Sequence, residues 1–354
     1  MATVGERHAM TPVGAGIVGA GNYGKYRRDR MRETGLFRLL ACFDINPAAM
    51  AAAQREDGCV PVESFDALLD FPGIEAVVIS TGASSHAEYA IRAAERGKHV
   101  FVEKPLCCDP GELEALLTAG ERAGVAMGMG HTPLDGAADR LLAQYLAEGR
   151  LGTVTAIEMT TCHGGGWQPS AWRFLPERNP GGMLFHCGVH HIAWLQHFFG
   201  RVTEVAAMMR GDVNPNTPTA DAATVLLRLE SGLLATLHAY HVTAYHHYKY
   251  LYGTLGNLYI HEFPTEVAFQ ARSPEGKPEP KVRLADDDFP AGKEDLTGNL
   301  ESWARAIRGQ GVPTPSIYDG AATVAVVFAA DEAARTGRVT AVPDYTARSR
   351  APAS

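Results

Sequence analysis

The chain has 354 residues, of which 32 are Lys or Arg and 40 are Asp or Glu, so its formal charge is −8 with histidine neutral. Nucleic-acid binding draws most of its affinity from cationic side chains on phosphates, and the absence of any Lys/Arg block in this acidic chain argues against such partners. With 46% hydrophobic and 20% charged residues, the composition excludes long disorder, and at roughly 150 residues per domain the length favours two domains.

The first residues and the hydropathy of the chain indicate neither secretion nor a membrane partner. Residues 1–21 lack a basic segment followed by an unbroken apolar run, which a signal peptide requires. No apolar run approaches the roughly 18 residues that cross a bilayer. The cysteines show no CxxC spacing, which is typical of reduced thiols, so we expect a cytoplasmic protein. They are Cys42, Cys59, Cys107, Cys108, Cys162 and Cys187.

Apolar runs and helical stretches alternate from residue 13 onward. The run at 13–21 ends in a glycine-rich turn and precedes a helical stretch at 25–34. A second run at 37–44 precedes a helix that begins at Pro47, with Asn46 as its expected N-cap. This order predicts a strand, a tight turn and a helix, followed by a second strand and helix.

The alternation continues to about residue 129. Further strands are expected at 76–80, 99–102 and 125–129, and further helices at 86–96 and 110–123. Ser85 and Glu88 have the spacing of a capping box, and Asp109 is the expected cap of the later helix. Repeated units of this length predict a right-handed, doubly wound parallel sheet, which is a Rossmann fold.

The glycine-rich turn has the spacing of a dinucleotide-binding motif. Gly19 permits the turn, Gly21 lets a pyrophosphate approach the backbone, and Gly24 lets the helix pack against the strand. Asp44 ends the second strand, where its carboxylate would accept hydrogen bonds from the adenosine ribose and repel a 2′-phosphate, so NAD is favoured over NADP. The alternative is a glycine-rich turn in a sheet protein that binds no nucleotide.

Two further segments connect the sequence with a known family. Glu103-Lys104-Pro105 directly follows a predicted strand, and residues 181–190 read GGMLFHCGVH. Together with the glycine motif, they resemble the Gfo/Idh/MocA family of nicotinamide-dependent oxidoreductases, the glucose-fructose oxidoreductase and inositol dehydrogenase type. The resemblance covers almost the whole chain, including residues 315–320 and the alanine-rich helix after them.

The resemblance implies an α/β protein of two domains. The first, residues 1–129, is the NAD-binding Rossmann domain, and the second, residues 130–354, is a substrate and oligomerisation domain with a mostly antiparallel open sheet. A final helix at about 315–336 would pack back toward the Rossmann domain. Alternating β-prone segments agree with this outline, and a two-residue Ser231-Gly232 hairpin would join the last pair of them. These segments are 153–163, 202–210, 222–230 and 233–241.

The resemblance also assigns roles to individual residues. His190 falls on the catalytic histidine and Lys104 on the catalytic lysine, where imidazole can move a proton and ammonium can stabilise an alkoxide. Pro105 would fix the turn that carries Lys104, and family members often have a cis bond there. The bland alternatives are a surface lysine and a core histidine. The expected cofactor-binding residues are Gly19, Gly21, Asn22, Tyr23, Gly24, Asp44, Thr81, His86, Glu103 and Lys104.

Two positions depart from the family pattern. His186 stands where the family usually has an aspartate four residues before the catalytic histidine, and on a regular helix it would share a face with His190. Losing that carboxylate should lower the pKa of His190 or change which histidine takes the proton, and a cationic His186 would favour an acidic sugar. His131 stands where many members have a basic-aromatic step. The expected substrate contacts are Arg173, Trp172 and His163.

The predicted function is hydride transfer between NAD and a secondary hydroxyl or keto group of a sugar, sugar acid or cyclitol, by a homodimer or homotetramer. One alternative is a hydrolase or lyase that oxidises a sugar transiently. Others are a non-catalytic binding protein and a metal-assisted enzyme built on His186 and His190. The metal reading lacks the zinc-peptidase pattern because Cys187 follows His186, so no metal is predicted. Its third ligand would come from His163, His241, His246 or His247.

Histidine is the one skewed residue type. Of 14 histidines, only His8, His86 and His99 precede residue 131, and the others lie between His131 and His261. Composition alone gives no reason for this.

Overall fold

The computed structural model describes residues 10–131, 134–164, 175, 178–214, 219–277, 279–292 and 294–348. It divides into two compact units. The first unit comprises Met1–Pro133, Leu296–Ala321 and Tyr345–Ser354, and the second comprises Leu134–Asp295 and Ala322–Asp344. The assignment of 1–129 and 130–354 as domains stays a prediction. Within the described ranges, no helix combines the length and apolarity needed to cross a bilayer.

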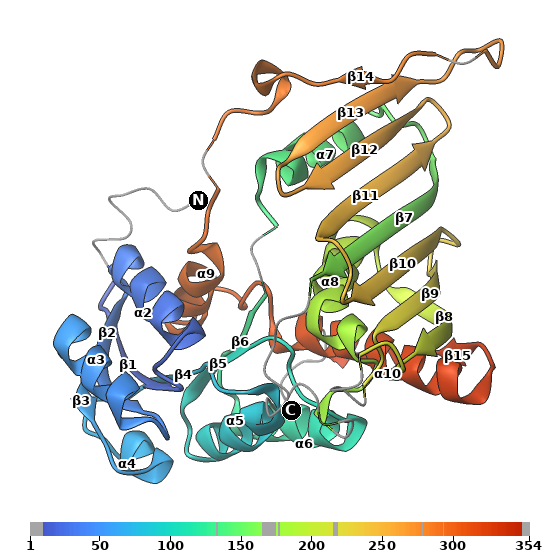
Figure 1. The fold of residues 1–354 in the computed structure, drawn as a ribbon. Helices are drawn as coiled ribbons and strands as arrows, with labels where there is room; N and C mark the ends of the chain where they lie inside the picture. The colour runs from blue at the N-terminus through green and yellow to red at the C-terminus, as the bar shows by residue number, and fades with distance from the viewer. Residues whose placement is uncertain are drawn as a thin grey trace. The chain divides into compact units, whose positions relative to one another are not determined.

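The first unit contains a six-stranded parallel sheet in the order β3-β2-β1-β4-β5-β6 (Figure 1). This is the order of a Rossmann fold, so the predicted doubly wound sheet is confirmed. Strands β1 and β4 are buried along their whole length, as expected of parallel strands covered on both faces. The strands are β1 Val13–Val18, β2 Phe37–Phe43, β3 Val60–Pro61, β4 Ala76–Ile79, β5 His99–Glu103 and β6 Met127–Gly130.

The helices of this unit begin and end largely where local signals place them. Asn46 accepts a hydrogen bond from the Ala48 amide, and Asp109 accepts from the amides of Gly111 and Glu112, so both predicted caps are confirmed. The helices are α2 Tyr23–Thr34, α3 Pro47–Asp57, α4 Phe65–Leu69, α5 His86–Glu95, α6 Pro110–Ala123 and α9 Gly298–Ile307.

The capping box predicted for α5 is wrong. Ser85 closes a 3₁₀ turn, Ala83–Ser85, and its hydroxyl contacts the Gly82 carbonyl at 3.0 Å and the Thr81 hydroxyl at 2.8 Å. Its side chain therefore makes no cap hydrogen bond to α5. The loop after β4 uses the hydroxyl that the sequence pattern assigned to the helix.

A helix from far along the chain completes the core of the first unit. Trp303 of α9 packs its ring 5.4 Å from Phe37 and 5.3 Å from Phe101, and its indole donates to the Ala126 carbonyl at 3.1 Å. The ring is fully buried. A segment beyond residue 295 is thus part of the hydrophobic core around the parallel sheet.

The second unit is built on a nine-stranded sheet in the order β14-β13-β12-β11-β7-β10-β9-β8-β15 (Figure 1). All pairs are antiparallel except β7 with β10, which confirms the predicted mostly antiparallel sheet. The strands are β7 Val154–His163, β8 Val202–Arg210, β9 Ala222–Leu229, β10 Leu234–His241, β11 His246–Gly253, β12 Gly256–Glu262, β13 Glu266–Ala271, β14 Val282–Arg283 and β15 Thr340–Ala341.

One face of this sheet is covered by helices and the other is open. Alternate residues of β11 are buried, and those between them are partly exposed. Tyr145 of α7, Ala137–Ala147, contacts Phe269 of β13, and Trp194 of α8, Val189–Phe199, lies against Lys249 of β11. The last helix, α10, Ile317–Thr336, begins in the first unit and continues in the second.

The hairpin between β9 and β10 is confirmed, with a longer loop than predicted. Leu229 donates to the Leu233 carbonyl at 2.9 Å, and Gly232 donates to the Leu229 carbonyl at 2.9 Å. Because Leu229 pairs with Leu233, three residues and not two form the loop. Gly232 has φ +87° and takes the left-handed position that such loops require.

Candidate functional site

The glycine turn after β1 is closely packed at two of its three glycines. Gly19 has φ +83°, and a Cβ there would lie 2.6 Å from the Ser80 carbonyl oxygen. A Cβ on Gly24 would overlap the Gly19 carbonyl oxygen. Among the described residues, a Cβ on Gly21 would meet the Ala49 methyl alone, at 3.5 Å. Gly19 and Gly24 therefore shape the turn, whereas Gly21 leaves its backbone open on one side.

Asp44 lies directly beside this turn. One carboxylate oxygen accepts from the Ala20 amide at 2.7 Å and from the Gly21 amide at 3.3 Å. The other accepts from the Asn46 amide at 2.8 Å. These contacts hold the carboxylate at the end of β2, and Oδ1, which accepts one hydrogen bond, has an acceptor site left.

The N-terminus of α2 has no negative charge of its own. Its first turn contains no acidic residue, and Asn22, at φ 39°, makes no side-chain cap hydrogen bond. Tyr23 is 49% exposed beside it. Since a helix N-terminus carries a positive dipole end, the turn is suited to an anionic group such as a pyrophosphate.

Glu103 and Lys104 follow β5 and have different surroundings. Glu103 is 3% exposed and forms an ion pair with Arg27 of α2, which is 2% exposed. Arg27 also donates to the Gly130 carbonyl at 3.1 Å, so it joins α2 to the ends of β5 and β6. Lys104 is half-buried, and the Lys104–Pro105 peptide bond is cis, as the resemblance implied.

Arg27 is a residue that the sequence analysis missed. It occupies the buried side of α2 together with Gly24 and Met31. A charged residue at the helical spacing of a buried stripe indicates a buried partner of opposite charge. The burial of Arg27 could therefore have been predicted from the sequence. Its partner could not, because Glu103 is distant in sequence.

His86 lies between two loops of the first unit. Its Nδ1 is 2.7 Å from the Pro105 carbonyl oxygen and its Nε2 is 3.0 Å from the Thr81 carbonyl oxygen. Burial lowers the pKa of His86, against the raising effect of the two carbonyls. A neutral imidazole has one N–H, so it donates to one of these oxygens. The ring therefore ties the loop after β4 to the turn that carries Lys104.

His131 shares the surroundings of Lys104. It is 5% exposed at the end of the Rossmann segment. Burial first, and then the charges of Lys104 and Arg27, lower the pKa of His131 to about 3. The ring is therefore neutral at neutral pH and adds no charge near Lys104.

His186 and His190 do not lie on one regular α-helix, which corrects the predicted geometry. His186 belongs to a π-helical turn, Leu184–Gly188, and is 8% exposed. His190 is half-buried and is the second residue of α8. The turn packs against β10, where a Cβ on Gly188 would lie 3.5 Å from Leu237. The two histidines therefore need not share one face, as they would at i, i+4 on a regular α-helix.

His163 and His241 are opposite each other at the carboxyl ends of β7 and β10. These strands are parallel, and the ring centroids are 6.3 Å apart. His241 Nδ1 is 3.9 Å from Asp221, a 2%-exposed carboxylate that the sequence analysis did not single out. Burial lowers the pKa of both histidines, and at His241 Asp221 opposes that effect. Part of the histidine excess is thus gathered at the carboxyl ends of two central strands of the second sheet.

The predicted site residues that the structure describes belong to both units. The first unit holds the cofactor residues and Lys104, and the second holds His163, His186 and His190. Trp172 and Arg173 lie outside the described residues.

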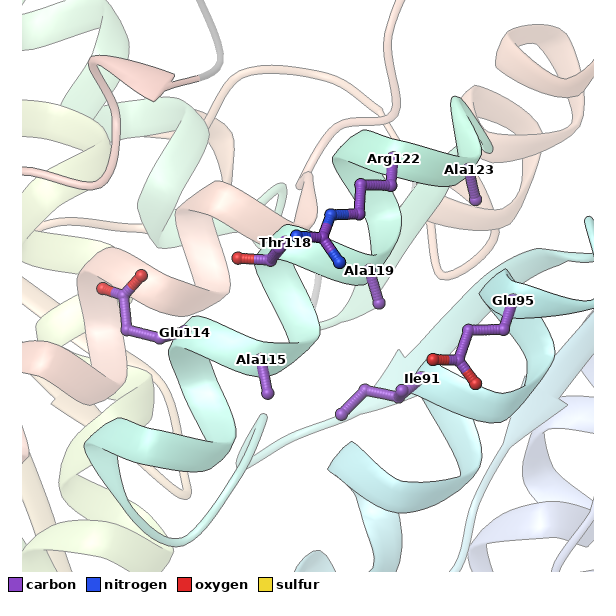
Figure 2. A pocket seen from close by; sticks show the side chains of 8 residues that line it. All are labelled: Ile91, Glu95, Glu114, Ala115, Thr118, Ala119, Arg122 and Ala123. Atoms are coloured by element: carbon purple, nitrogen blue, oxygen red, sulfur yellow. The ribbon is translucent and has the colours of Figure 1, made fainter.

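A surface hollow elsewhere in the first unit contains none of the predicted residues. Figure 2 shows it between α5 and α6, with Glu95, Glu114 and Arg122 among the residues that line it. Its lining is made of helix surface positions, so it is not the candidate site.

Two family models match the chain. Residues 13–131 match an oxidoreductase family with an NAD-binding Rossmann fold, and residues 140–259 match the GFO/IDH/MocA C-terminal domain. Together they cover more than half of the chain.

Relatives of known name agree with these matches. The chain is 28% identical over 256 residues to 2,7-anhydro-N-acetylneuraminate hydratase from Escherichia coli, covering 69% of this chain and 66% of that relative, just under two thirds of its length. It is 26% identical over 321 residues to inositol 2-dehydrogenase from Rhizobium meliloti, covering 89% and 94%. A solved levoglucosan dehydrogenase in complex with NADH and L-sorbose is similar with a TM-score of 0.82 at 21% identity, covering 95% and 100%, which shows a shared fold.

Proposed function

Because the chain belongs to the Gfo/Idh/MocA oxidoreductase family and binds NAD(P) through its Rossmann fold, we propose that it transfers hydride between NAD and a secondary hydroxyl or keto group of a sugar, sugar acid or cyclitol. The observation that carries the cofactor part is the Asp44 carboxylate, held 2.7 Å from the Ala20 amide at the glycine turn. Dehydrogenases for inositol and levoglucosan among the similar proteins support the substrate class.

The residues of the first unit fit a dinucleotide. Gly21 leaves its backbone open, α2 has no acidic residue in its first turn, and Asp44 is fixed beside both. A fixed carboxylate accepts hydrogen bonds from a ribose diol and repels a 2′-phosphate, which is the reason for NAD over NADP. When bound, NAD supplies the hydride acceptor or donor. Asn22, Tyr23 and Thr81 are proposed as further contacts.

Lys104 and His190 are proposed as the catalytic residues. The Lys104 ammonium would stabilise the negative charge that develops on the substrate oxygen, and the His190 imidazole would take or give the hydroxyl proton. His131 is neutral beside Lys104, and Arg27 neutralises Glu103. Glu103 and His86, which were predicted as cofactor-binding residues, are proposed also to position Lys104, because Glu103 is held by Arg27 and His86 contacts the Pro105 carbonyl.

His186 is proposed to adjust the reaction to an acidic substrate. It replaces the carboxylate that the family usually has before the catalytic histidine, so a substrate carboxylate would meet less repulsion there. We propose Trp172, Arg173 and His163 as further substrate contacts. The relative named as a 2,7-anhydro-N-acetylneuraminate hydratase supports the sugar acids as a class.

That relative also favours a second candidate function, a lyase or hydratase that oxidises the sugar transiently and reduces it again. The two functions differ in what becomes of the cofactor. Incubation with NAD and a panel of sugars, sugar acids and cyclitols, with product and reduced nicotinamide both quantified, separates them. Equal amounts of product and reduced nicotinamide support the dehydrogenase, and product without net reduction supports the second function.

We also propose that the chain forms a homodimer or homotetramer through the open face of the second sheet. Met208, Leu226 and Leu234 are 82%, 46% and 41% exposed, respectively. Large exposed apolar side chains on one sheet are typical of an interface. Light scattering of the purified protein tests this.

A further inference from the structure

A second group of polar side chains lies on the helix-covered face of the second sheet. His191 comes from α8, His247 from β11 and Glu262 from β12, and one ligand atom of each lies within 4.8 Å of the other two. His191 is 3% exposed and His247 is 8% exposed. The Glu262 side chain is 26% exposed, so this ligand is partly accessible to solvent.

The two imidazoles are poorly satisfied by the protein. Among the described residues, neither the ring nitrogens of His191 nor Nε2 of His247 make a hydrogen bond of ordinary geometry. The backbones of Cys187 and Cys162 lie close enough to raise the pKa of His191 and His247, respectively, against the larger lowering effect of burial. Nδ1 of His247 is 3.3 Å from the Thr161 hydroxyl. A buried polar group without a partner costs free energy, and native structures usually give such a group a water, an ion or a function.

We propose that His191, His247 and Glu262 bind one divalent transition-metal ion of the zinc type. Two imidazole nitrogens and one carboxylate oxygen are a donor set that zinc and its neighbours prefer, and three protein ligands leave a fourth position for water. The Thr161 hydroxyl would then orient the His247 ring from its other nitrogen, as outer partners of metal-bound histidines do.

The distances require only a small closure of the site. His191 Nε2 is 4.0 Å from Glu262 Oε2. Bonds of about 2.0–2.2 Å to a tetrahedral ion place donor atoms roughly 3.3–3.5 Å apart. The three ligand atoms lie within 4.8 Å of one another, so each pair must approach by at most about 1.5 Å. Rotations of the side chains can supply this difference, so the backbone of the sheet need not move.

Lys249 is the residue that opposes the ion. Its ammonium pairs with Glu262 Oε1 and lies 5.2 Å from the centre of the Trp194 ring. Glu262 has a second oxygen, Oε2, on the side of His191, so it can hold the ammonium and the ion together. Asp139, whose carboxylate accepts from the Trp194 indole at 2.9 Å, adds a second negative charge near Lys249. The positive charge of Lys249 would therefore weaken metal binding without preventing it.

The ion would join α8 to β11 and β12. It is a site distinct from the residues proposed for hydride transfer, although His191 directly follows His190. The inference therefore stands or falls independently of the proposed oxidoreductase reaction, and its test needs no substrate.

The test is metal binding by the full chain after treatment with a chelator. We expect one tight equivalent of Zn²⁺ by titration calorimetry, an intense visible absorption with Co²⁺ that indicates tetrahedral nitrogen and oxygen ligands, and a higher Tm with Zn²⁺. His247→Gln and Glu262→Gln should each weaken the tight equivalent by at least about 100-fold. The matched control is His246→Gln, because His246 is the neighbouring residue on β11 but is exposed. It should bind like the unmodified chain.

Lys249→Met provides a second arm in which affinity should increase. Removing the ammonium should tighten Zn²⁺ binding by about tenfold or more, since it removes a repulsive charge at close range. This arm remains decisive if a ligand variant fails to fold. The proposal is overturned if the chelated chain takes up no tight equivalent, if all variants bind alike through surface histidines, or if Lys249→Met binds no more tightly.

Discussion

Arg27 and Glu103 form an ion pair almost shielded from water, with side-chain exposures of 2% and 4%. Arg27 contributes from α2 and Glu103 from the end of β5, one residue before Lys104. Removing one of two paired buried charges lowers the free energy of unfolding, because the remaining charge is then buried without compensation. The pair therefore fixes the backbone that carries Lys104.

Breaking this pair should destabilise the first unit more than removing it. We expect Glu103→Gln to lower the free energy of unfolding by about 3–5 kcal/mol, because the Arg27 charge loses its partner. The double variant Arg27→Met/Glu103→Leu should recover most of that loss, since it leaves no unpaired charge. Urea denaturation measures both. A double variant as unstable as the single would show that the pair stabilises by more than mutual compensation.

Lys104→Met and His190→Asn should each lower kcat by about 10²- to 10⁴-fold, the usual contribution of a charge-stabilising or proton-transferring group. NAD affinity, measured by fluorescence titration, should remain within a few-fold of normal. His197→Asn, on the same helix as His190, is the matched control and should keep full turnover. Near-normal kcat in either test variant would refute the role assigned to that residue.

Substitutions at two glycines of the turn should affect NAD binding and protein stability separately. Gly21→Ala places a methyl only 3.5 Å from Ala49, an ordinary contact, so stability should be retained while NAD affinity falls by at least about tenfold. Gly24→Ala should destabilise the protein because its methyl would overlap the Gly19 carbonyl oxygen. Thermal melts with and without NAD report both quantities. The idea fails if Gly21→Ala binds NAD normally.

Asp44→Asn tests the choice of cofactor. The amide oxygen can still accept from the Ala20 and Gly21 amides, and the hydrogen bond from the Asn46 amide is lost, so most of the loop contacts should persist. Loss of the charge should weaken NAD binding and improve NADP binding, which would shift the ratio of the two Kd values by about tenfold or more. An unchanged ratio would mean that Asp44 serves the loop and not the ribose.

His131 should make stability depend on pH in acid. Its folded pKa, about 3, lies below the ordinary 6.5, so the unfolded chain takes up a proton first as the pH falls. His131 therefore costs no stability above about pH 6.5, and stability is lost progressively between about pH 6.5 and 3, by about 1.4 kcal/mol per pH unit. His131→Gln should remove about that slope. Unfolding free energies between pH 7 and 4 measure it, and parallel curves for the two proteins would contradict the expectation.

Local chemistry made much of the first unit predictable. Asn46 and Asp109 cap helices through residues two or three positions away, so their hydrogen bonds follow from the sequence alone. Ser85 misled the same reasoning because the preceding loop competes for its hydroxyl. Trp303 could not be assigned to the parallel sheet by any local pattern, because its contacts are with residues more than 170 positions earlier, such as Ala126.

The candidate site divides in the same way. Family motifs pointed to Lys104, His190 and Asp44, each in a short recognisable segment. Asp221 and Glu262 stand in no motif, and they acquire meaning only through the strands that bring histidines beside them. The π-helical turn at His186 could not be predicted from the sequence either, because the sequence patterns of a π turn and of an α-helix differ little over five residues.

The close packing at Gly19 and Gly24 also predicts how the glycine turn would change during evolution. Selection for folding alone would keep both glycines, because a side chain at either collides with backbone whether or not a nucleotide is bound. Gly21 is under no such constraint from the fold. A descendant that had lost its cofactor would thus retain Gly19 and Gly24 and accept other residues at position 21. A substitution at residue 21 would therefore be the first sign in a sequence that nucleotide binding had been lost.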